Sequence, residues 1–371
     1  MRSFCFQYSL ASSTRAGPQG LALTGRRAAG LPHSRRHAMT AVVAVDLGKT
    51  GCRAALWRGT GPTGDVHEVE GAPGLAAKDG VIASRDAVLA AVRPLLEGGH
   101  ALPLATVCVG AAGAATAPEA ARAMARLLLR DLPTREVAVT SDAITAHAGA
   151  LNGETGVVLA IGTGAVAVGI GAGGVFARVD GWGPWLGDAG SGAWIGLAGL
   201  RAALRAHDGR GPATALLAAA VERFGAVGQW PAVVAGDGNP ARTAASFAPD
   251  IALLAAEGDE AAGSILHEAA AELAQSVVAA GRPLGDSAVD IALTGGLVGI
   301  GEPLLAPLRA ALAVAAGRVR LREALGTPLD GGRLLALSTS LPHESHVVRV
   351  RGDYPSGVVP AMQAAPAAAS N

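Results

Sequence analysis

Two short turns rich in glycine and threonine carry groups that can bind phosphate. The first is Gly48-Lys49-Thr50 and the second, later in the chain, is Gly162-Thr163-Gly164, and each follows a run of apolar residues. Backbone N–H groups in such turns can point at an anion without a side chain in the way. Lys49 and Thr50 would add a cation and a hydroxyl. Both turns are therefore predicted to bind phosphate, although neither has the spacing of a Walker A motif.

Two aspartates stand at the ends of expected strands. Asp46 ends the first strand, where its carboxylate would lie close to a bound phosphate. Because both groups are negative, a cation must lie between them, so Asp46 is a candidate ligand of Mg²⁺. The alternative is a carboxylate that bonds its own turn. Asp142 lies between a strand and a helix, where it could cap the helix or act as the base that accepts a hydroxyl proton during phosphoryl transfer.

The loop from Asp180 to Ser191 combines glycines, two tryptophans and two carboxylates. An aromatic face can pack on the C–H surface of a sugar ring, and a carboxylate can accept its hydroxyl protons. Gly181, Trp182 and Asp188 are therefore candidates for a sugar site, with Asp188 as the hydroxyl acceptor. The alternative is that the tryptophans belong to the hydrophobic core.

Two further sets of residues follow expected strands. Gly295 and Gly296 come directly after the apolar run Val289–Leu293, where a backbone without side chains would let an adenine or a ribose lie close. His343 and His346 are a poor metal pair, because no acidic or thiol cluster accompanies them in the sequence. We interpret these histidines as structural.

Composition excludes several classes of protein. The chain has 371 residues, half of them hydrophobic and 16% charged, which rules out a fully disordered chain and suits about two domains. Its 30 basic residues balance 30 acidic ones, but residues 1–38 hold six arginines and no acid. The rest is mildly acidic and has only two lysines, Lys49 and Lys78, which disfavours nucleic-acid binding.

Three cysteines without CxxC spacing argue against a disulfide framework, a zinc site and an iron–sulfur cluster. Cys52 and Cys108 lie in apolar runs and are expected to be buried small hydrophobes, whereas Cys5 lies near the N-terminus. This pattern suits a reducing cytoplasm. The uncharged segment 155–176 is long enough to cross a membrane, but its glycines predict two strands and a tight turn instead.

The expected elements alternate between strands and helices, which indicates the α/β class. Strands are predicted at 42–45, 53–57, 104–109, 136–140, 289–293 and 319–322, besides the uncharged hairpin. Helices are predicted from Ser84 as N-cap, and over 118–130, 143–151, 193–206, 213–224, 240–256, 259–280, 303–316 and 332–337. We expect residues 1–38 to be a disordered leader or the result of a start codon assigned too far upstream. We expect one domain over 39–141, a second over 142–351, and a loose tail over 352–371.

In their order along the chain, these motifs resemble the BadF/BadG/BcrA/BcrD-type ATPase family, and most of all its N-acetylglucosamine kinase branch. The resemblance covers roughly residues 41–338 and rests on Asp46-x-Gly48-x-Thr50, Ser141-Asp142-Ala143, Gly162-Thr163-Gly164, Gly181-Trp182-Gly183 with Gly187-Asp188-x-Gly190-Ser191, and Gly295-Gly296. The string from Gly181 to Ser191 is the most specific element. The phosphate turns are shared by the wider superfamily of sugar kinases, Hsp70 and actin.

The resemblance implies two ribonuclease-H-like domains around a cleft that binds ATP, Mg²⁺ and an amino sugar. It implies that Asp46 serves the metal, that both turns hold the phosphates, and that Gly295 and Gly296 lie at the adenosine. It further implies Asp142 as the base for the 6-hydroxyl of N-acetylglucosamine, with Trp182 and Asp188 in the sugar pocket. The expected partner is a small amino sugar, with no nucleic acid or membrane, and a homodimer is possible.

Three positions depart from the family's usual pattern. Ala165 stands where the family has Ser, Ala189 stands where it has Glu, and no sugar-contacting Asn occurs near Leu75. Glucosamine or another N-acyl hexosamine could therefore be the acceptor. Two other roles stay open within the same resemblance: an ATPase that activates an acyl-CoA dehydratase, and a sugar sensor without catalysis.

Overall fold

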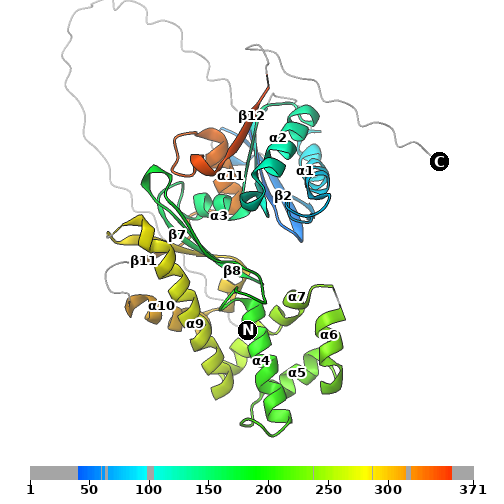
Figure 1. The fold of residues 1–371 in the computed structure, drawn as a ribbon, viewed down its shortest axis with the longest axis vertical. Coiled ribbons are helices and arrows are strands. Elements are labelled where there is room, and N and C mark those ends of the chain that lie inside the picture. The colour runs from blue at the N-terminus through cyan, green and yellow to red at the C-terminus, as the bar shows by residue number, and fades with distance from the viewer. Residues whose placement is uncertain are drawn as a thin grey trace, which may run out of the picture. The chain divides into compact units, whose positions relative to one another are not determined.

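The structure is a computed structural model, and it describes residues 41–59, 61, 62, 66–97, 104–236, 238–285, 287–314 and 319–352 (Figure 1). The predicted leader, and all of the predicted tail beyond Gly352, lie outside the described residues, as does Cys5. In the described part of the chain, no helix has the length and apolar character needed to cross a membrane.

The first sheet has seven strands in the order β12-β6-β5-β1-β2-β3, with β4 also paired to β2. Its strands are β1 (Ala41–Leu47), β2 (Gly51–Arg58), β3 (Gly61–Pro62), β4 (His67–Glu70), β5 (Leu104–Ala111), β6 (Thr134–Thr140) and β12 (Val348–Arg351). β1 pairs antiparallel with β2 and parallel with β5. Because β1 is covered on both faces, its apolar run is continuous rather than alternating.

The second sheet repeats this construction with five strands in the order β11-β10-β7-β8-β9. Its strands are β7 (Gly156–Ile161), β8 (Ala165–Ile170), β9 (Phe176–Asp180), β10 (Val289–Thr294) and β11 (Val319–Arg322). β7 pairs antiparallel with β8 and parallel with β10, as β1 does with β2 and β5. The two similar glycine turns of the sequence thus occupy matching places, each between the first two strands of a sheet. The uncharged segment 155–176, which is long enough to cross a membrane, contains this β7–β8 hairpin and the first residue of β9. The prediction of two strands and a tight turn is confirmed.

Helices cover both sheets, and α3 contacts both of them. The helices are α1 (Gly80–Leu96), α2 (Pro118–Asp131), α3 (Asp142–Ala150), α4 (Gly192–His207), α5 (Leu216–Phe224), α6 (Trp230–Gly236), α7 (Pro240–Ala245), α8 (Ala248–Ala256), α9 (Glu260–Gly281), α10 (Glu302–Val314) and α11 (Pro328–Leu337). α1 and α2 pack on one side of the first sheet, and α3 and α11 on the other. A small core shared by β5, β6, α3, α11 and β8 links the two sheets through α3.

Several details differ from the sequence-based prediction. Ser84 is not the N-cap of α1, which begins at Gly80, because Asp79 turns the chain in the left-handed region and Ser84 is buried inside the helix. The helix predicted over 240–256 is two helices, α7 and α8, interrupted at Ser246 and Phe247. Strands β3, β4, β9 and β12 and helix α6 were not predicted.

Strand β12 returns the chain to the first sheet, where it pairs antiparallel with β6. α3 and α11 also pack on the first sheet. The segment 142–351 therefore contributes to both sheets, because its first helix, its last helix and its last strand pack with the first sheet. The domain boundary at residue 141 stays a prediction.

Candidate active site

Asp142 is the first residue of α3, one position inside the helix. The N-cap is Ser141, whose Oγ accepts a hydrogen bond from the N–H of Ile144 at 3.3 Å. One carboxylate oxygen of Asp142 accepts a hydrogen bond from the N–H of Ala143 at 2.9 Å. The structure therefore assigns capping to Ser141, and the Asp142 carboxylate is available for chemistry at the positive end of the helix.

Asp142, Asp46 and Lys49 interact electrostatically near the ends of strands β1 and β6 of the first sheet. Burial raises the pKa of Asp142 above its ordinary value, and the nearby charge of Asp46 raises it further, whereas the N–H of Ala143 and the charge of Lys49 act in the opposite direction. A carboxyl group with a raised pKa beside a second carboxylate and a lysine is typical of a general base or acid.

Asp46 has a partner that the sequence analysis did not identify. It lies directly opposite Arg53 in the β1–β2 hairpin, and Nη2 of Arg53 donates to Oδ2 of Asp46 at 2.5 Å. Between them the turn closes with a hydrogen bond from the N–H of Gly48 to the carbonyl of Gly51 at 2.9 Å. Lys49 and Thr50 at its tip are exposed. The first turn thus presents a cation and a hydroxyl to solvent while Arg53 orients the carboxylate.

The second turn is supported by the start of α4. The N–H of Gly192 donates to the carbonyl of Gly162 at 2.8 Å, and the N–H of Ala193 donates to that of Thr163 at 3.1 Å. Thr163 is exposed. Gly162 faces open space, so that a ligand could approach its backbone. The predicted phosphate turn is held from behind and is accessible from the front.

Gly295 packs against the same turn region. It adopts a φ of 96°, and a Cβ there would collide with the backbone of Ile161, the last residue of β7. Gly296 is exposed and faces open space. The end of β10 therefore lies beside the end of β7 with room at the surface, which is compatible with the adenosine position that the sequence predicts.

Asp180 organises the loop that precedes α4. Its two carboxylate oxygens accept hydrogen bonds from the N–H groups of Asp188 at 2.7 Å and Ala189 at 2.8 Å. Asp180 and Asp188 both have φ in the left-handed region, at 63° and 56°. Sequence reasoning gave Asp180 no role, although an aspartate followed by glycine is a familiar turn signal.

Asp188 is buried against the second turn. One of its oxygens accepts from the N–H of Gly183 at 3.2 Å, and a Cβ added at Gly164 would come within 2.7 Å of the other. Burial raises the pKa of Asp188, the Gly183 N–H opposes the rise, and the charge of Asp180 adds to it. The side chain thus connects the loop to the phosphate turn, and its hydroxyl-acceptor role stays a prediction.

Trp182 is 68% exposed and carries the guanidinium of Arg178 over its ring, 5.2 Å from the ring centre. Trp185 is 72% exposed. Neither tryptophan belongs to the core, so the core interpretation of these two side chains is wrong. Gly181, with φ 76°, accepts a hydrogen bond from Arg178 through its carbonyl. Trp182 therefore presents an aromatic face at the surface of the loop.

The three departures from the family pattern lie at positions where the backbone does the bonding. The N–H of Ala165 stabilises the ionised Asp188, and the N–H of Ala189 donates to Asp180. Leu75 is buried, and its N–H donates to the carbonyl of Ala112 at 2.9 Å. These contacts do not require the side chains that the family usually has.

The two groups of predicted residues lie at the ends of different sheets. The first group lies at strand ends of the first sheet and consists of Asp46, Gly48, Lys49, Thr50 and Asp142. The second group lies at strand ends and in the loop of the second sheet and consists of Gly162, Thr163, Gly164, Gly181, Trp182, Asp188, Gly295 and Gly296. Within the described residues, no hydrogen bond or ion pair joins the two groups directly. No group of three or more His, Cys, Asp or Glu side chains in the described residues could hold a metal by itself.

Cys52 and Cys108 are buried, as the sequence predicts. Burial raises the pKa of each thiol to about 12. Since a metal cluster needs accessible thiolates, neither of these two cysteines suits a cluster ligand.

Known proteins resemble this chain in sequence and in fold. Residues 43–320 match the BadF/BadG/BcrA/BcrD ATPase family. A candidate N-acetylglucosamine kinase from Chromobacterium violaceum is 26% identical, with a TM-score of 0.62 over 81% of this chain and 99% of that chain. A second candidate N-acetylglucosamine kinase, from Porphyromonas gingivalis, is 21% identical, with a TM-score of 0.60 over 82% and 99%.

A glucokinase of the ROK family from Streptomyces griseus, solved with glucose and AMPPNP, is 19% identical, with a TM-score of 0.50 over 80% of this chain and 99% of that chain. No curated protein sequence gives a significant match. The structural likenesses show the fold of two ribonuclease-H-like domains that sugar kinases have. Since the family match spans most of its length, the chain belongs to the BadF/BadG/BcrA/BcrD ATPase family.

Proposed function

We propose that this protein transfers the γ-phosphoryl group of ATP to a hydroxyl of an amino sugar, with N-acetylglucosamine and its 6-hydroxyl as the preferred acceptor. The observation that carries the proposal is the Asp142 carboxylate, which stands at the start of α3 with a raised pKa, within the electrostatic influence of Asp46 and Lys49. The family membership and the likeness to candidate N-acetylglucosamine kinases support the same reaction.

Asp142 is the proposed general base. As the sugar hydroxyl attacks the γ-phosphorus, the Asp142 carboxylate accepts the hydroxyl proton, while the bond from the γ-phosphorus to the leaving oxygen of ADP breaks. Phosphoryl transfer depends mostly on positioning and electrostatics, so a base fixed on the first turn of a helix suits it. The raised pKa brings this carboxyl closer to neutral pH, where proton transfer is more efficient.

The two glycine turns would hold the phosphates. In the first turn the N–H of Gly48 already donates to Gly51, so Lys49 and Thr50 would supply backbone N–H groups together with a cation and a hydroxyl. In the second turn the N–H of Gly162 already donates to the carbonyl of Gly164, so Thr163 and Gly164 would supply the N–H groups, from a turn that α4 supports. Gly295 and Gly296 would leave room for the adenosine, since the surface at Gly296 is open.

Magnesium fits the residues present at the first sheet. Mg²⁺ is commonly bound through one or two carboxylates together with waters and substrate phosphates. Arg53 donates a hydrogen bond to one carboxylate oxygen of Asp46, which leaves the other oxygen available. The Asp142 carboxylate is close enough for the charge of Asp46 to raise its pKa. Asp46 would hold the ion, and the ion when bound would neutralise phosphate charge.

The sugar would lie against the loop that Asp180 organises. Trp182 offers an exposed aromatic face, Gly181 shapes the turn beside it, and Asp188 would accept a sugar hydroxyl. A kinase of this kind would act on a small molecule in the cytoplasm, where ATP is available. Glucosamine and other N-acyl hexosamines are the alternative acceptors.

The test is to incubate the full chain with ATP and Mg²⁺ and to measure ADP release with N-acetylglucosamine, glucosamine, N-acetylmannosamine and glucose. We expect release to be fastest with N-acetylglucosamine, and phosphorus NMR of the product to show a phosphate on carbon 6. The Asp142→Asn variant is the control for contaminating kinases. No release with any sugar would refute the proposal, and stabilisation by a sugar without ADP release would indicate a sensor.

A further inference from the structure

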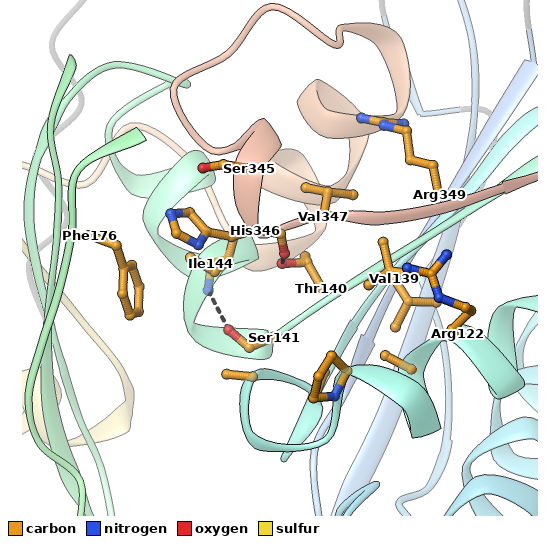
Figure 2. A pocket seen from close by; sticks show the side chains of 15 residues that line it. Arg122, Val139, Thr140, Ser141, Ile144, Phe176, Ser345, His346, Val347 and Arg349 are labelled. Atoms are coloured by element: carbon orange, nitrogen blue, oxygen red, sulfur yellow. Dashed lines mark hydrogen bonds between the residues drawn. The ribbon is translucent and has the colours of Figure 1, made fainter. Parts of the chain in front are cut away.

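A cavity of about 600 Å³ lies beside the first turn of α3, and its lining does not include the predicted catalytic residues (Figure 2). Its walls come from the start of α2, the end of β6, the first turn of α3, residues 345–349 and Phe176. Asp142, Asp46 and Lys49 do not line it, although Ser141 and Ile144 beside Asp142 do. The volume falls within the usual range of small-molecule sites, about 300–1,000 Å³.

The charges around this cavity favour an anion. Its lining includes Arg122, Arg349 and His346, and none of the described residues that line it is an aspartate or a glutamate. The charge of Arg349 is already used, because it pairs with Glu136 at 2.6 Å and with Glu344 at 2.7 Å outside the lining. Arg122 makes no ion pair or hydrogen bond with any residue that the structure describes. Arg122 is therefore the cation that an anionic ligand would meet.

The helix that carries Arg122 adds to this preference. α2 begins at Pro118, and its N-cap Ala117 has no side chain that could accept hydrogen bonds from the first turn. Pro118, Ala121 and Arg122 all line the cavity. The partial positive charge of this helix end and the guanidinium of Arg122 therefore lie at the same cavity, while Glu119 in the first turn, which does not line the cavity, offsets part of the helix-end charge.

The opposite side of the cavity is aromatic. Figure 2 shows Phe176 across the cavity from Arg122. The Phe176 ring is 39% exposed and packs on the His346 ring, with 4.7 Å between the ring centres. Thr140, Ser141 and Ser345 also line the cavity; the Thr140 hydroxyl donates to the carbonyl of His346 at 2.8 Å, and the Ser141 hydroxyl caps α3. An aromatic face, hydroxyl groups and one cation together suit a polar ring that carries a phosphate.

We propose that this cavity binds a phosphorylated hexosamine, with its phosphate at Arg122 and the start of α2 and its ring against Phe176. The choice of sugar rests on the proposed function, since that reaction would produce such a molecule. Phe176 begins β9 of the second sheet, whereas Arg122 and Thr140 belong to the layers of the first. A ligand that fills the cavity would therefore contact both sheets at a site other than the catalytic one.

Calorimetric binding of N-acetylglucosamine 6-phosphate to the full chain tests the proposal, with N-acetylglucosamine and a non-hydrolysable ATP analogue present to compete for the catalytic site. We expect binding that these competitors do not displace. Arg122→Gln should weaken it about tenfold or more, the effect of losing one charge-assisted contact. Arg126→Gln is the matched control, because Arg126 lies one turn further along α2, is exposed and does not line the cavity.

Inorganic phosphate serves as the second probe. Phe176→Ala should weaken the sugar phosphate and leave inorganic phosphate unchanged, because only the sugar ring would meet the aromatic face. The proposal would be overturned if the sugar phosphate did not bind, or if the competitors displaced it fully. It would also be overturned if the wild type and Arg122→Gln bound the sugar phosphate equally, or if the wild type bound both probes equally. Binding that depends on Arg122 would support the cavity even if the ADP-release test failed, so the two proposals fail separately.

Discussion

The ring of His147 lies against the ring of His343, with 2.9 Å between Nδ1 of His147 and Nε2 of His343. Nε2 of His147 lies 3.0 Å from the carbonyl of Gly156 at the start of β7. Because a carbonyl only accepts, this Nε2 must carry the proton, so Nδ1 of His147 accepts from Nε2–H of His343. Nδ1 of His343 is then a bare lone pair, buried and without a partner among the described residues. Protonation of His147 at Nδ1 would remove the acceptor of the bond between the two rings and place a charge in a buried site.

Acid should therefore destabilise the protein through this pair. Burial lowers the pKa of His147 to about 4 and that of His343 to about 3, both from 6.5. Between pH 6.5 and about 4 the unfolded chain binds more protons than the folded one, so stability falls as the pH falls and is fully present above pH 6.5. Denaturant unfolding at pH 7.5 and pH 5 would measure this loss.

The His343→Gln variant isolates the contribution of one ring. A glutamine amide can still donate to His147 but does not titrate, so the slope of stability against pH should decrease by up to about 1.4 kcal/mol per pH unit. His267→Gln is the control, since His267 is exposed on α9. An unchanged slope in His343→Gln would show that this histidine is not neutral in the fold.

Replacing Asp142 separates catalysis from stability. Asp142→Asn should lower kcat by about 10²-fold or more, as expected for a lost general base, and leave ATP affinity unchanged. Because burial and the Asp46 charge raise the pKa of Asp142, the ionised carboxyl costs stability above its ordinary pKa of 3.8, so the variant should melt at the same or a higher temperature.

The control for this variant is Asp86→Asn, since Asp86 is a half-exposed carboxylate on α1. It should change neither kcat nor the melting temperature appreciably. Turnover of Asp142→Asn near that of the wild type would remove Asp142 from the mechanism. A large drop in melting temperature would instead indicate a structural role.

Lys49 should make a small contribution to the pKa of Asp142, after burial, the N–H of Ala143 and the charge of Asp46. The Lys49 charge lowers that pKa, so Lys49→Met should raise it further. A carbon-13 NMR titration of the Asp142 carboxyl in the free protein measures this shift directly, with Asp142→Asn identifying the signal. Lys78→Met is the matched control, because Lys78 is exposed and does not contribute to the pKa of Asp142. Equal titration of Lys49→Met and the wild type would contradict the arrangement.

Asp180 should hold the sugar loop in shape. Asp180→Ala removes the acceptor of two backbone N–H groups, which should cost about 1–3 kcal/mol of stability and raise the KM for the sugar. Asp180→Asn should cost less, because asparagine tolerates a positive φ and keeps one acceptor oxygen.

The control for Asp180 is Asp208→Ala, an aspartate that pairs with Arg210 at the surface. Urea unfolding and sugar-dependent ADP release measure the two effects of the Asp180 changes. If Asp180→Ala kept both the stability and the KM of the wild type, the loop would not depend on this carboxylate.

Local signals in the sequence predicted several of the turns and helix starts that carry the candidate site residues. A turn of glycine and threonine between two apolar runs is a short-range pattern, and both such turns occur where they were predicted. The starts of α2 and α3 were likewise near their predicted positions, because Pro118 and Ser141-Asp142 are local helix signals. Cys52 and Cys108 are buried because the runs that contain them are strands covered by helices.

Other features depend on contacts between distant segments. β12 is a short strand of alternating valines and arginines, and it pairs with β6 more than 200 residues earlier. In the sequence, nothing distinguishes Arg53 from the other arginines. Only the register of the β1–β2 hairpin places it opposite Asp46. His343 was interpreted as structural, but nothing near it in the sequence indicates that His147 is its partner.

The sequence alone determined the local elements from which the candidate chemistry was predicted, because glycine turns, a carboxylate at a strand end and an aspartate at a helix start are set by neighbouring residues. Only the tertiary structure decided which of these groups interact. Burial and the charge of a residue about a hundred positions away set the pKa of Asp142. The crossing of the chain back to the first sheet builds the cavity at Arg122 and Phe176. Distances and desolvation between remote segments are properties of packing, which no local pattern encodes.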